Sequence, residues 1–290
     1  MIPAAFDYAA PTTLEEALTL LAQAGDDGKI LAGGQSLIPV LKLRLAAPEH
    51  IIDLGKIEGL SGISEDGDSI VIGAMTPHHV VANDPLVAQH AGLIQKATQT
   101  VADPQVRHRG TFGGALVHAD PAGDLPAPAL ALEAQFVIAG SGGTRTVAAA
   151  DFFTGLFTTA VGEDEILTEV RIPKTTGWGS DYQKFTRVAQ QWSIVGIAAA
   201  IRVEGGTIAE ARIGLTNMGS VPLRATAVER ALVGCALEAA AVEGATASAG
   251  EGADPPSDPN GDADFRRHLA GVLTARAVLA AGAALTNGRA

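Results

Sequence analysis

Cysteine is nearly absent from this chain, and basic residues are in the minority. The single cysteine, Cys235, cannot build a disulfide framework or a multi-cysteine zinc site, and an iron–sulfur cluster also needs several thiolates. Only 20 lysines and arginines stand against 32 aspartates and glutamates, which gives a net charge of −12. Nucleic-acid binding and electrostatic adhesion to anionic membranes both need a basic face, so both are disfavoured.

Long hydrophobic runs are also missing. No stretch approaches the roughly 20 apolar residues of a membrane helix, and the opening MIPAAFDYAAP has no basic segment followed by an apolar one. We therefore expect no transmembrane segment, no secretory signal, and a soluble cytoplasmic protein. The 290 residues are enough to bury a full core and to form two lobes.

Helix and strand patterns are grouped along the chain and do not strictly alternate, which predicts a mixed α+β fold. Thr13 and Glu16 form a capping box at the start of a helix within residues 12–28. Glycine-rich turns predict β-hairpins over residues 133–153 and 194–217.

The composition changes at PKTTGWGSD, residues 173–181, which is the best candidate for a domain boundary. Beyond it, the last predicted helix spans residues 265–285. On this helix, one face is predicted to carry Phe265, Leu269, Val272 and Leu279.

Two glycine pairs resemble catalytic or nucleotide-binding loops, and most such interpretations fail on spacing. In GQSLI, Ile38 occupies the place where a nucleophile elbow, G-x-S-x-G, needs its second glycine, so Ser36 is disfavoured as a nucleophile. Neither a G-x-G-x-x-G loop after a strand nor a Walker A loop is present.

The same glycine pairs fit an anion-binding role. A predicted strand runs into residues 33–36, GGQS, and RGTFGG at residues 109–114 offers a second turn with Thr111 as a hydroxyl donor. Successive backbone amides without bulky side chains attract anionic oxygens, so a diphosphate fits between two such turns. Ordinary glycine turns at strand ends are the alternative interpretation.

The histidines show no metal-binding pattern. His78 and His79 are adjacent and diverge by about 100° on a helix, and the other five lack ligand spacing. We expect surface or helix-end histidines and no metal site. The segment HADPAGDLPAP, residues 118–128, carries two aspartates; in such a stretch an aspartate caps a turn more often than it transfers protons.

Three stretches together resemble a known family: LAGGQSLIPVLKLRL, VADPQVRHRGTFGGALVHADPAGDLPA and EILTEVRIP, in that order. They are similar to the FAD-binding medium subunits of the molybdenum hydroxylases, and the whole chain looks closest to those of aerobic carbon monoxide dehydrogenases. The resemblance implies a two-lobed FAD-binding domain of the vanillyl-alcohol oxidase (PCMH) type over residues 1–175, with lobes of about 1–56 and 57–175. A C-terminal α+β domain, a three-stranded sheet with helices, is implied over residues 176–290.

The resemblance also implies which residues contact FAD. Residues 29–37 would wrap the diphosphate and ribityl chain, and Gly110–Gly114 would close the opposite side, while Lys184 matches a lysine beside the flavin ring and Trp192 an aromatic that gates electron acceptors. Two departures are Phe112, expected to change packing, and Ala115, where many members have asparagine. The expected cofactor-binding residues are Lys29, Ile30, Leu31, Ala32, Gly33, Gly34, Gln35, Ser36, Leu37, Val101, Gly110, Thr111, Gly113, Gly114, Asp124, Leu167, Lys184 and Trp192.

The implied function is electron transfer, with no catalytic acid, base or metal ligand in this chain. A large molybdenum-containing subunit would oxidise CO with water to CO2, and a small [2Fe–2S] subunit would deliver electrons to FAD and on to quinone or another acceptor. The family implies a dimer of heterotrimers in the cytoplasm, or peripheral to the inner face of the membrane through partners. The alternatives are a sister enzyme that oxidises an aldehyde, purine or N-heterocycle, and a stand-alone flavin-binding protein.

Overall fold

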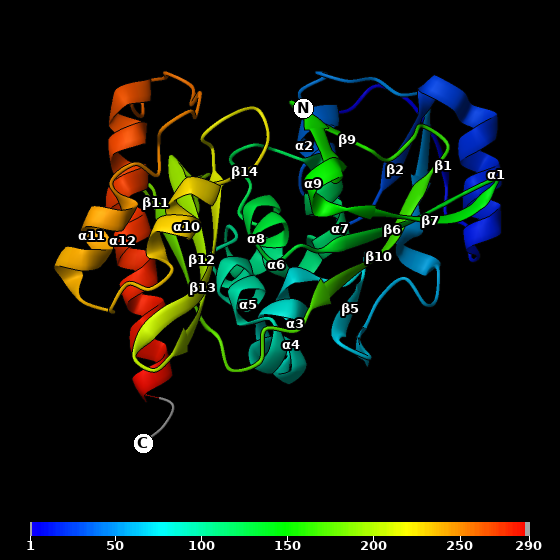
Figure 1. Ribbon diagram of the computed structural model, residues 1–290. Helices are drawn as coiled ribbons and strands as arrows, with labels where there is room; N and C mark the ends of the chain where they lie inside the picture. Colours follow the sequence, from blue (N-terminus) through cyan, green and yellow to red (C-terminus); the bar gives the residue numbers. More distant parts are fainter. Residues whose placement is uncertain (1, 288–290) are drawn as a thin grey trace.

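The structure is a computed structural model and describes residues 2–287. It contains three principal β-sheets arranged in a row (Figure 1). The N-terminal lobe (blue) lies at one side, the C-terminal sheet and helices (yellow to red) lie at the other, and a cyan-to-green central part separates them. The central part therefore has one boundary with the N-terminal lobe and another with the C-terminal sheet.

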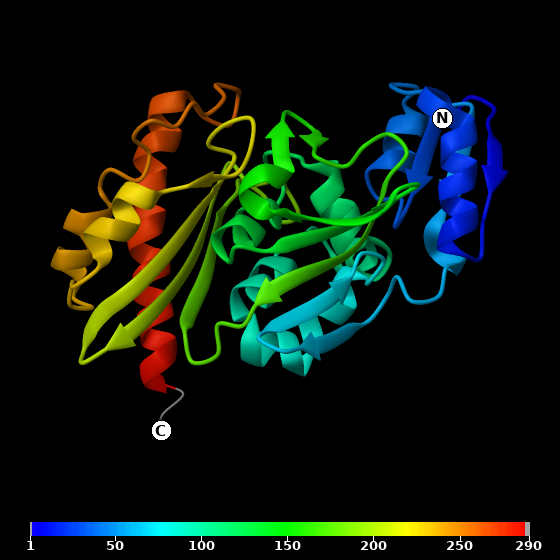
Figure 2. The same ribbon diagram turned by 45° about the vertical axis from the view of Figure 1, so that its right-hand side comes forward.

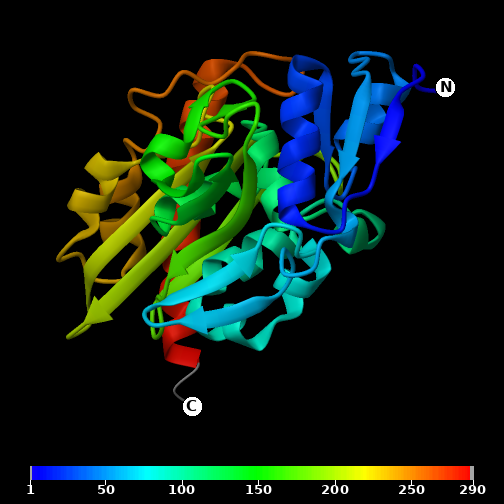
Figure 3. The same cartoon turned by 90° about the vertical axis from the view of Figure 1, so that its right-hand side faces the viewer.

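The N-terminal lobe holds a three-stranded parallel sheet in the order β1-β3-β2, with α1 beside it (Figure 3). Thr13 caps α1 by accepting a hydrogen bond from the Glu16 amide at 3.2 Å, and the Glu16 carboxylate accepts from the Thr12 amide at 3.0 Å. The predicted capping box is therefore confirmed. The elements are β1 (Asp7–Ala9), α1 (Leu14–Ala24), η1 (Gly25–Asp27), β2 (Gly28–Leu31), α2 (Leu37–Lys42), β3 (His50–Asp53) and η2 (Leu54–Lys56).

The central part is built on a five-stranded antiparallel sheet in the order β4-β5-β10-β6-β7. The predicted hairpin is confirmed as β6 and β7, which pair from Gln135–Ala148 to Gly140–Gly143. The strands are β4 (Ile63–Asp66), β5 (Ser69–Gly73), β6 (Gln135–Gly140), β7 (Gly143–Ala148), β8 (Phe153–Gly155), β9 (Thr158–Thr159) and β10 (Ile166–Pro173). The helices are α3 (His78–Asn83), α4 (Pro85–His90), α5 (Gly92–Gln99), α6 (Pro104–Arg109), α7 (Phe112–His118), α8 (Pro126–Ala131) and α9 (Ala149–Phe152).

The C-terminal part is an antiparallel sheet in the order β11-β12-β13-β14. It contains the three long strands expected from the sequence, and the two-residue β14 pairs with the end of β13 as a fourth. Gly205 and Gly206 form the expected turn, with φ of 58° and 84°, which glycine adopts freely. The elements are β11 (Gly179–Phe185), β12 (Val195–Glu204), β13 (Thr207–Thr216), β14 (Leu223–Arg224), α10 (Thr226–Leu232), α11 (Ala239–Thr246) and α12 (Ala263–Asn287).

The sequence of β12 explains how its sheet is covered on both faces. Val195, Ile197 and their alternating neighbours belong to the core shared with α12, whereas Ala198 and Ala200 belong to the core of the central part. Small side chains on this second face let α5 and α8 approach closely. A Cβ on Gly214 of β13 would lie 2.4 Å from the carbonyl oxygen of Ala127 in α8. The C-terminal sheet is therefore packed tightly onto the central part.

Helix α12 runs along the outer face of this sheet (Figure 2). By length and composition Ala263–Leu285 is the one helix in residues 2–287 that could cross a membrane, and 56% of its apolar 18-residue window is buried within the protein. Of the four residues predicted to share one face, Leu269 is buried, whereas Phe265 is 40% exposed. The buried positions include Arg266, Ala270 and Ala277 together with Leu273 and Val278, so the packing face combines small residues, larger apolar residues and one arginine.

Candidate functional site

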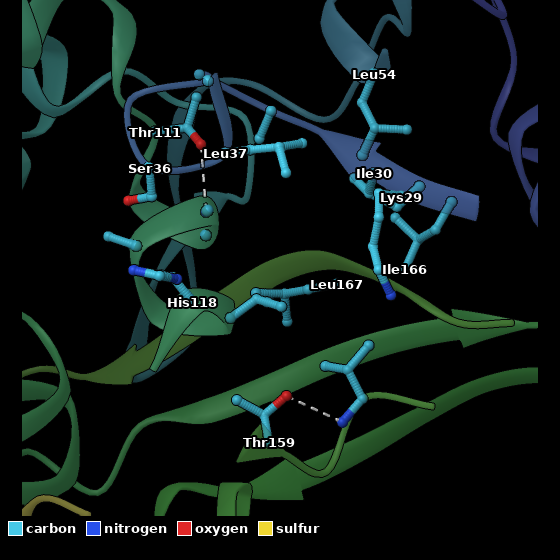
Figure 4. Close-up of a pocket in the computed structure, with 18 of the residues that line it drawn as sticks. Lys29, Ile30, Ser36, Leu37, Leu54, Thr111, His118, Thr159, Ile166 and Leu167 are labelled. Atoms are coloured by element: carbon cyan, nitrogen blue, oxygen red, sulfur yellow. Dashed lines mark hydrogen bonds between the residues drawn. The ribbon is translucent and has the colours of Figure 1, made fainter. Parts of the chain in front are cut away.

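A cavity of about 600 Å³ lies between the N-terminal lobe and the central part. Figure 4 shows Ser36, Thr111 and His118 along one side of it, with Lys29 and Ile166 on the other. The walls come from β2 and the loop after it, from α7, and from the segment between β9 and β10. A volume of this size is typical of a site for a large organic ligand.

The loop between β2 and α2 presents backbone amides that the protein does not use. Within residues 2–287, none of the four amides from Gly33 to Ser36 donates a hydrogen bond to a protein acceptor. Gly34 has φ of 74°, a left-handed value that helps successive amides point the same way. All four residues line the cavity, so this loop matches the anion-binding cradle predicted from the sequence.

The second glycine segment is built differently from the first. Thr111 caps α7, and its hydroxyl accepts a hydrogen bond from the Gly114 amide at 3.2 Å. The amides of Phe112 and Gly113 donate to Thr76 and Ala74 carbonyls at 2.9 and 2.8 Å. These donors are already used within the protein, so the expectation of a second turn with several successive free amides is wrong. Among the amides of Gly110–Gly114, that of Thr111 alone has no protein acceptor within residues 2–287, and the segment contributes mainly shape.

The two segments touch each other where glycine is required. A Cβ on Gly33 would lie 2.1 Å from the Arg109 carbonyl oxygen and 2.6 Å from Cα of Gly110. A Cβ on Gly113 would lie 2.5 Å from that of Ala74. These glycines therefore serve the packing of one backbone against another, which holds the cavity walls at their present separation.

Most of the sequence-predicted residues gather around the cavity, and the remainder lie apart from it. Leu31 packs beneath Gly34, since the absent Gly34 Cβ would lie 3.2 Å from its Cδ1. Thr111 and Leu167 reach the cavity from α7 and β10. The predicted residues that line it are Lys29, Ile30, Ala32, Gly33, Gly34, Gln35, Ser36, Leu37, Gly110, Thr111, Gly113, Gly114 and Leu167. Those outside its lining are Leu31, Val101, Asp124, Lys184 and Trp192.

Asp124 and Lys184 meet in a buried polar cluster between the central part and the C-terminal sheet. Lys184 Nζ lies 2.7 Å from Asp124 Oδ2, and it also donates to the Thr100 carbonyl at 3.1 Å. Ser193 and Tyr182 donate to Asp124 Oδ1 at 2.9 and 3.0 Å. Burial raises the pKa of Asp124 above its ordinary value, although Lys184 and both hydroxyl donors favour the charged form.

Trp192 is adjacent in the chain to Ser193, a member of this polar cluster. It precedes Ser193 in the loop between β11 and β12, and its residue surface is 53% exposed. Asn217 holds the same loop by donating to the Ser193 carbonyl at 2.8 Å. A large aromatic side chain is thus held at the surface by a buried anchor one residue away.

The sequence did not reveal several residues that line the cavity. His78 was expected at the surface or at a helix end; it begins α3, yet it is only 3% exposed. His118, at the end of α7, lies with its ring 5.3 Å from that of Phe157, and burial lowers the pKa of His118. Phe157 has φ of 52°, which the sequence gives no means of anticipating. Other lining residues without a sequence signal are Thr158, Thr159, Val161 and Ile166.

The burial of His78 predicts a pH-dependent stability. Burial, with a smaller contribution from the nearby Arg107 charge, lowers the pKa of His78 from 6.5 to about 4. As the pH falls through 6.5, the unfolded chain binds a proton that the folded chain does not, so stability is lost between about pH 6.5 and 4. Compared with His78→Phe, the cofactor-free wild type should lose about 3 kcal/mol over this range. Urea denaturation at several pH values measures it; parallel curves for the two proteins would contradict the prediction.

The arrangement is suited to holding an elongated anionic ligand. Free amides on one wall attract negative oxygens, and Ile30, Leu37 and Leu167 offer apolar contact further along. The acidic Glu165 at the wall is paired with Arg145 at 2.6 Å, which offsets its charge. A phosphate-containing organic cofactor fits this combination.

The chain matches known protein families over most of its length. Residues 4–175 match the FAD binding domain in molybdopterin dehydrogenase, and residues 180–281 match the CO dehydrogenase flavoprotein C-terminal domain. The carbon monoxide dehydrogenase medium chain of Afipia carboxidovorans is 41% identical over 99% of this chain and 100% of its own.

Two solved structures are similar throughout. A chain of carbon monoxide dehydrogenase from Hydrogenophaga pseudoflava has 45% identity and a TM-score of 0.93, with 98% of this chain and 99% of that chain covered. A chain of quinoline 2-oxidoreductase from Pseudomonas putida 86 has 36% identity and the same TM-score of 0.93, with 98% and 100% covered. The fold is therefore shared equally with both, and only the sequence identity separates them.

Proposed function

The chain belongs to the FAD-binding subunits of the molybdenum-dependent dehydrogenases, and on that basis we propose that it is the medium subunit of an aerobic carbon monoxide dehydrogenase. The complete reaction converts CO and H2O into CO2, two protons and two electrons. The observation that carries the proposal is the identity of 41–45% to carbon monoxide dehydrogenase chains over nearly the whole length. The quinoline-oxidising relative reaches 36%.

FAD is the cofactor, and the cavity fits it. The unclaimed amides of Gly33–Ser36 would hold its diphosphate, and the cavity of about 600 Å³ would enclose much of its length. When bound, FAD supplies the redox chemistry that this chain's side chains lack, linking one-electron donors to a two-electron acceptor. The protein's part is to bind, to orient, and to exclude water along the apolar wall.

The other redox centres are assigned to partner subunits. One cysteine cannot ligate an iron–sulfur cluster, so a small subunit would carry the [2Fe–2S] clusters and a large subunit the molybdenum site. A dimer of heterotrimers, a quinone as electron acceptor, and a cytoplasmic location complete the proposal. Lys184 and Trp192 would serve the flavin end of the cofactor, on the side of the C-terminal sheet.

A second candidate is the FAD subunit of a sister enzyme that oxidises an aldehyde, a purine or an N-heterocycle. The equal TM-score of 0.93 to the quinoline 2-oxidoreductase chain supports it, because the fold is common to both functions. In either case the substrate pocket belongs to the large subunit.

The test uses the complex purified with its partner subunits. We expect about one FAD per chain after acid release, and bleaching of the flavin absorbance when CO is added under anaerobic conditions. Quinoline and a simple aldehyde, which are substrates of the sister class, serve as comparison compounds and should leave the flavin oxidised. Bleaching by either of these and not by CO would establish the sister function, and a complex without FAD would refute the cofactor role.

A further inference from the structure

His78 lies at the point where the two glycine segments meet. Its backbone amide donates to the Gly110 carbonyl at 2.9 Å, and its side chain lines the cavity. A Cβ on Gly110 would lie 2.9 Å from Cδ2 and 3.2 Å from Nε2 of the imidazole. Gly110 also packs against Gly33, which lies in the loop between β2 and α2 that presents the unused amides. The ring therefore packs against Gly110, next to the contact between the two glycine segments.

The imidazole is enclosed without being satisfied. Nδ1 of His78 is buried and has no hydrogen-bond partner within residues 2–287, and no partner is present for Nε2 either. Nε2 is not among the fully enclosed orphan atoms, which leaves it as the nitrogen open to the cavity. Buried polar groups without partners are uncommon in proteins. Nδ1 is enclosed and out of reach of a ligand, so Nε2 is the atom that a ligand in the cavity can complete.

A charged residue near His78 indicates which kind of ligand its imidazole would bind. The charge of Arg107 acts on the imidazole, and the Arg107 guanidinium donates to the Val101 carbonyl at 2.7 Å. The positive charge of Arg107 near the ring favours an anionic oxygen as the acceptor for an imidazole N–H.

We propose that His78 is a cofactor-binding residue that donates a hydrogen bond from Nε2 to a diphosphate oxygen of FAD. This inference rests on the proposed FAD role of the cavity. With the proton on Nε2, the ring adds one side-chain donor to the four backbone amides of Gly33–Ser36. Gly110 is then needed for a second reason, since any side chain there would displace the donor ring.

The experiment measures the FAD dissociation constant of the full chain by flavin fluorescence. His78→Phe keeps a flat ring and removes both nitrogens, so FAD should bind about 10- to 100-fold more weakly. His78→Gln places an amide nitrogen near the position of Nε2, and should bind FAD nearly as wild type does. His78→Asn places it near Nδ1, and should behave like His78→Phe. His79→Phe, at the exposed neighbour, is the matched control and should leave the affinity unchanged.

A second readout locates the contact on the cofactor. At FAD saturation, the 31P resonances of bound FAD should be similar in wild type and His78→Gln. They should be shifted in His78→Phe. Thermal unfolding of each cofactor-free variant checks that weaker binding does not come from loss of the fold.

The outcomes separate this inference from the function on which it rests. A wild-type chain that does not bind FAD overturns the proposed function. Wild-type affinity in His78→Phe, rescue by asparagine in place of glutamine, or unchanged 31P resonances would each overturn the role of His78 alone.

Discussion

Gly33→Ala should bind FAD at least about 100-fold more weakly than wild type, because displaced amides would lose hydrogen bonds to the charged diphosphate that are worth about 1.5–3 kcal/mol each. The added Cβ would stand 2.1 Å from the Arg109 carbonyl oxygen, where both neighbours are backbone and cannot rotate away. The two walls must separate, and the amides of Gly33–Ser36 move with them. Overpacking of this kind also lowers stability by about 1–3 kcal/mol.

FAD titration and urea denaturation of Gly33→Ala measure the two effects. The matched control is Gly244→Ala in α11, where a Cβ would meet nothing within 4 Å. This control should keep its FAD affinity and gain up to about 1 kcal/mol of stability, since alanine is the better helix former. Wild-type FAD affinity in Gly33→Ala would show that the wall separation does not govern binding.

Lys184→Met should destabilise the chain by about 3–5 kcal/mol, because it leaves the Asp124 carboxyl buried without its cation. Asp124 is 5% exposed, and the Lys184 side chain is 11% exposed, so water cannot replace the lost partner. Tyr182 and Ser193 would still donate to Asp124 but carry no compensating charge.

Two further variants make the test specific. Lys174→Met breaks a pair with Glu65 of the same 2.7 Å length at the surface, and should cost far less than Lys184→Met. Adding Asp124→Asn to Lys184→Met should recover more than half of the loss, because the buried charge is removed as well. Equal losses for the Lys174 and Lys184 variants, measured by urea denaturation, would contradict a dominant role for burial.

Local chemistry allowed several features to be predicted from the sequence. The capping box at Thr13 and the glycine turn at Gly205 depend on neighbours within a few residues, so their signals are complete in the sequence. The strand leading into Gly33 was visible for the same reason. The FAD assignment needed more: it came from whole motifs that resemble a known family, since glycine turns alone fit two interpretations.

What could not be predicted depends on segments far apart in the chain. The amides near Gly113 looked free, and they are used by carbonyls of Ala74 and Thr76 some forty residues earlier. The burial of His78 follows from its packing against Gly110, which no local pattern encodes. The buried face of α12 includes several alanines and Arg266, whose hydrophobic signal is weaker than that of the exposed Phe265.

The alanines of β12 limit how this protein can be recombined. Ala198 and Ala200 share one core with Phe136 and Leu116 of the FAD-binding part, although the two matching family regions are separated at residues 175–180. A chimaera that takes residues 4–175 from one relative and the rest from another must reproduce a backbone-close contact between α8 and β13 at Gly214. The two regions therefore have to be inherited, exchanged or engineered as a matched pair.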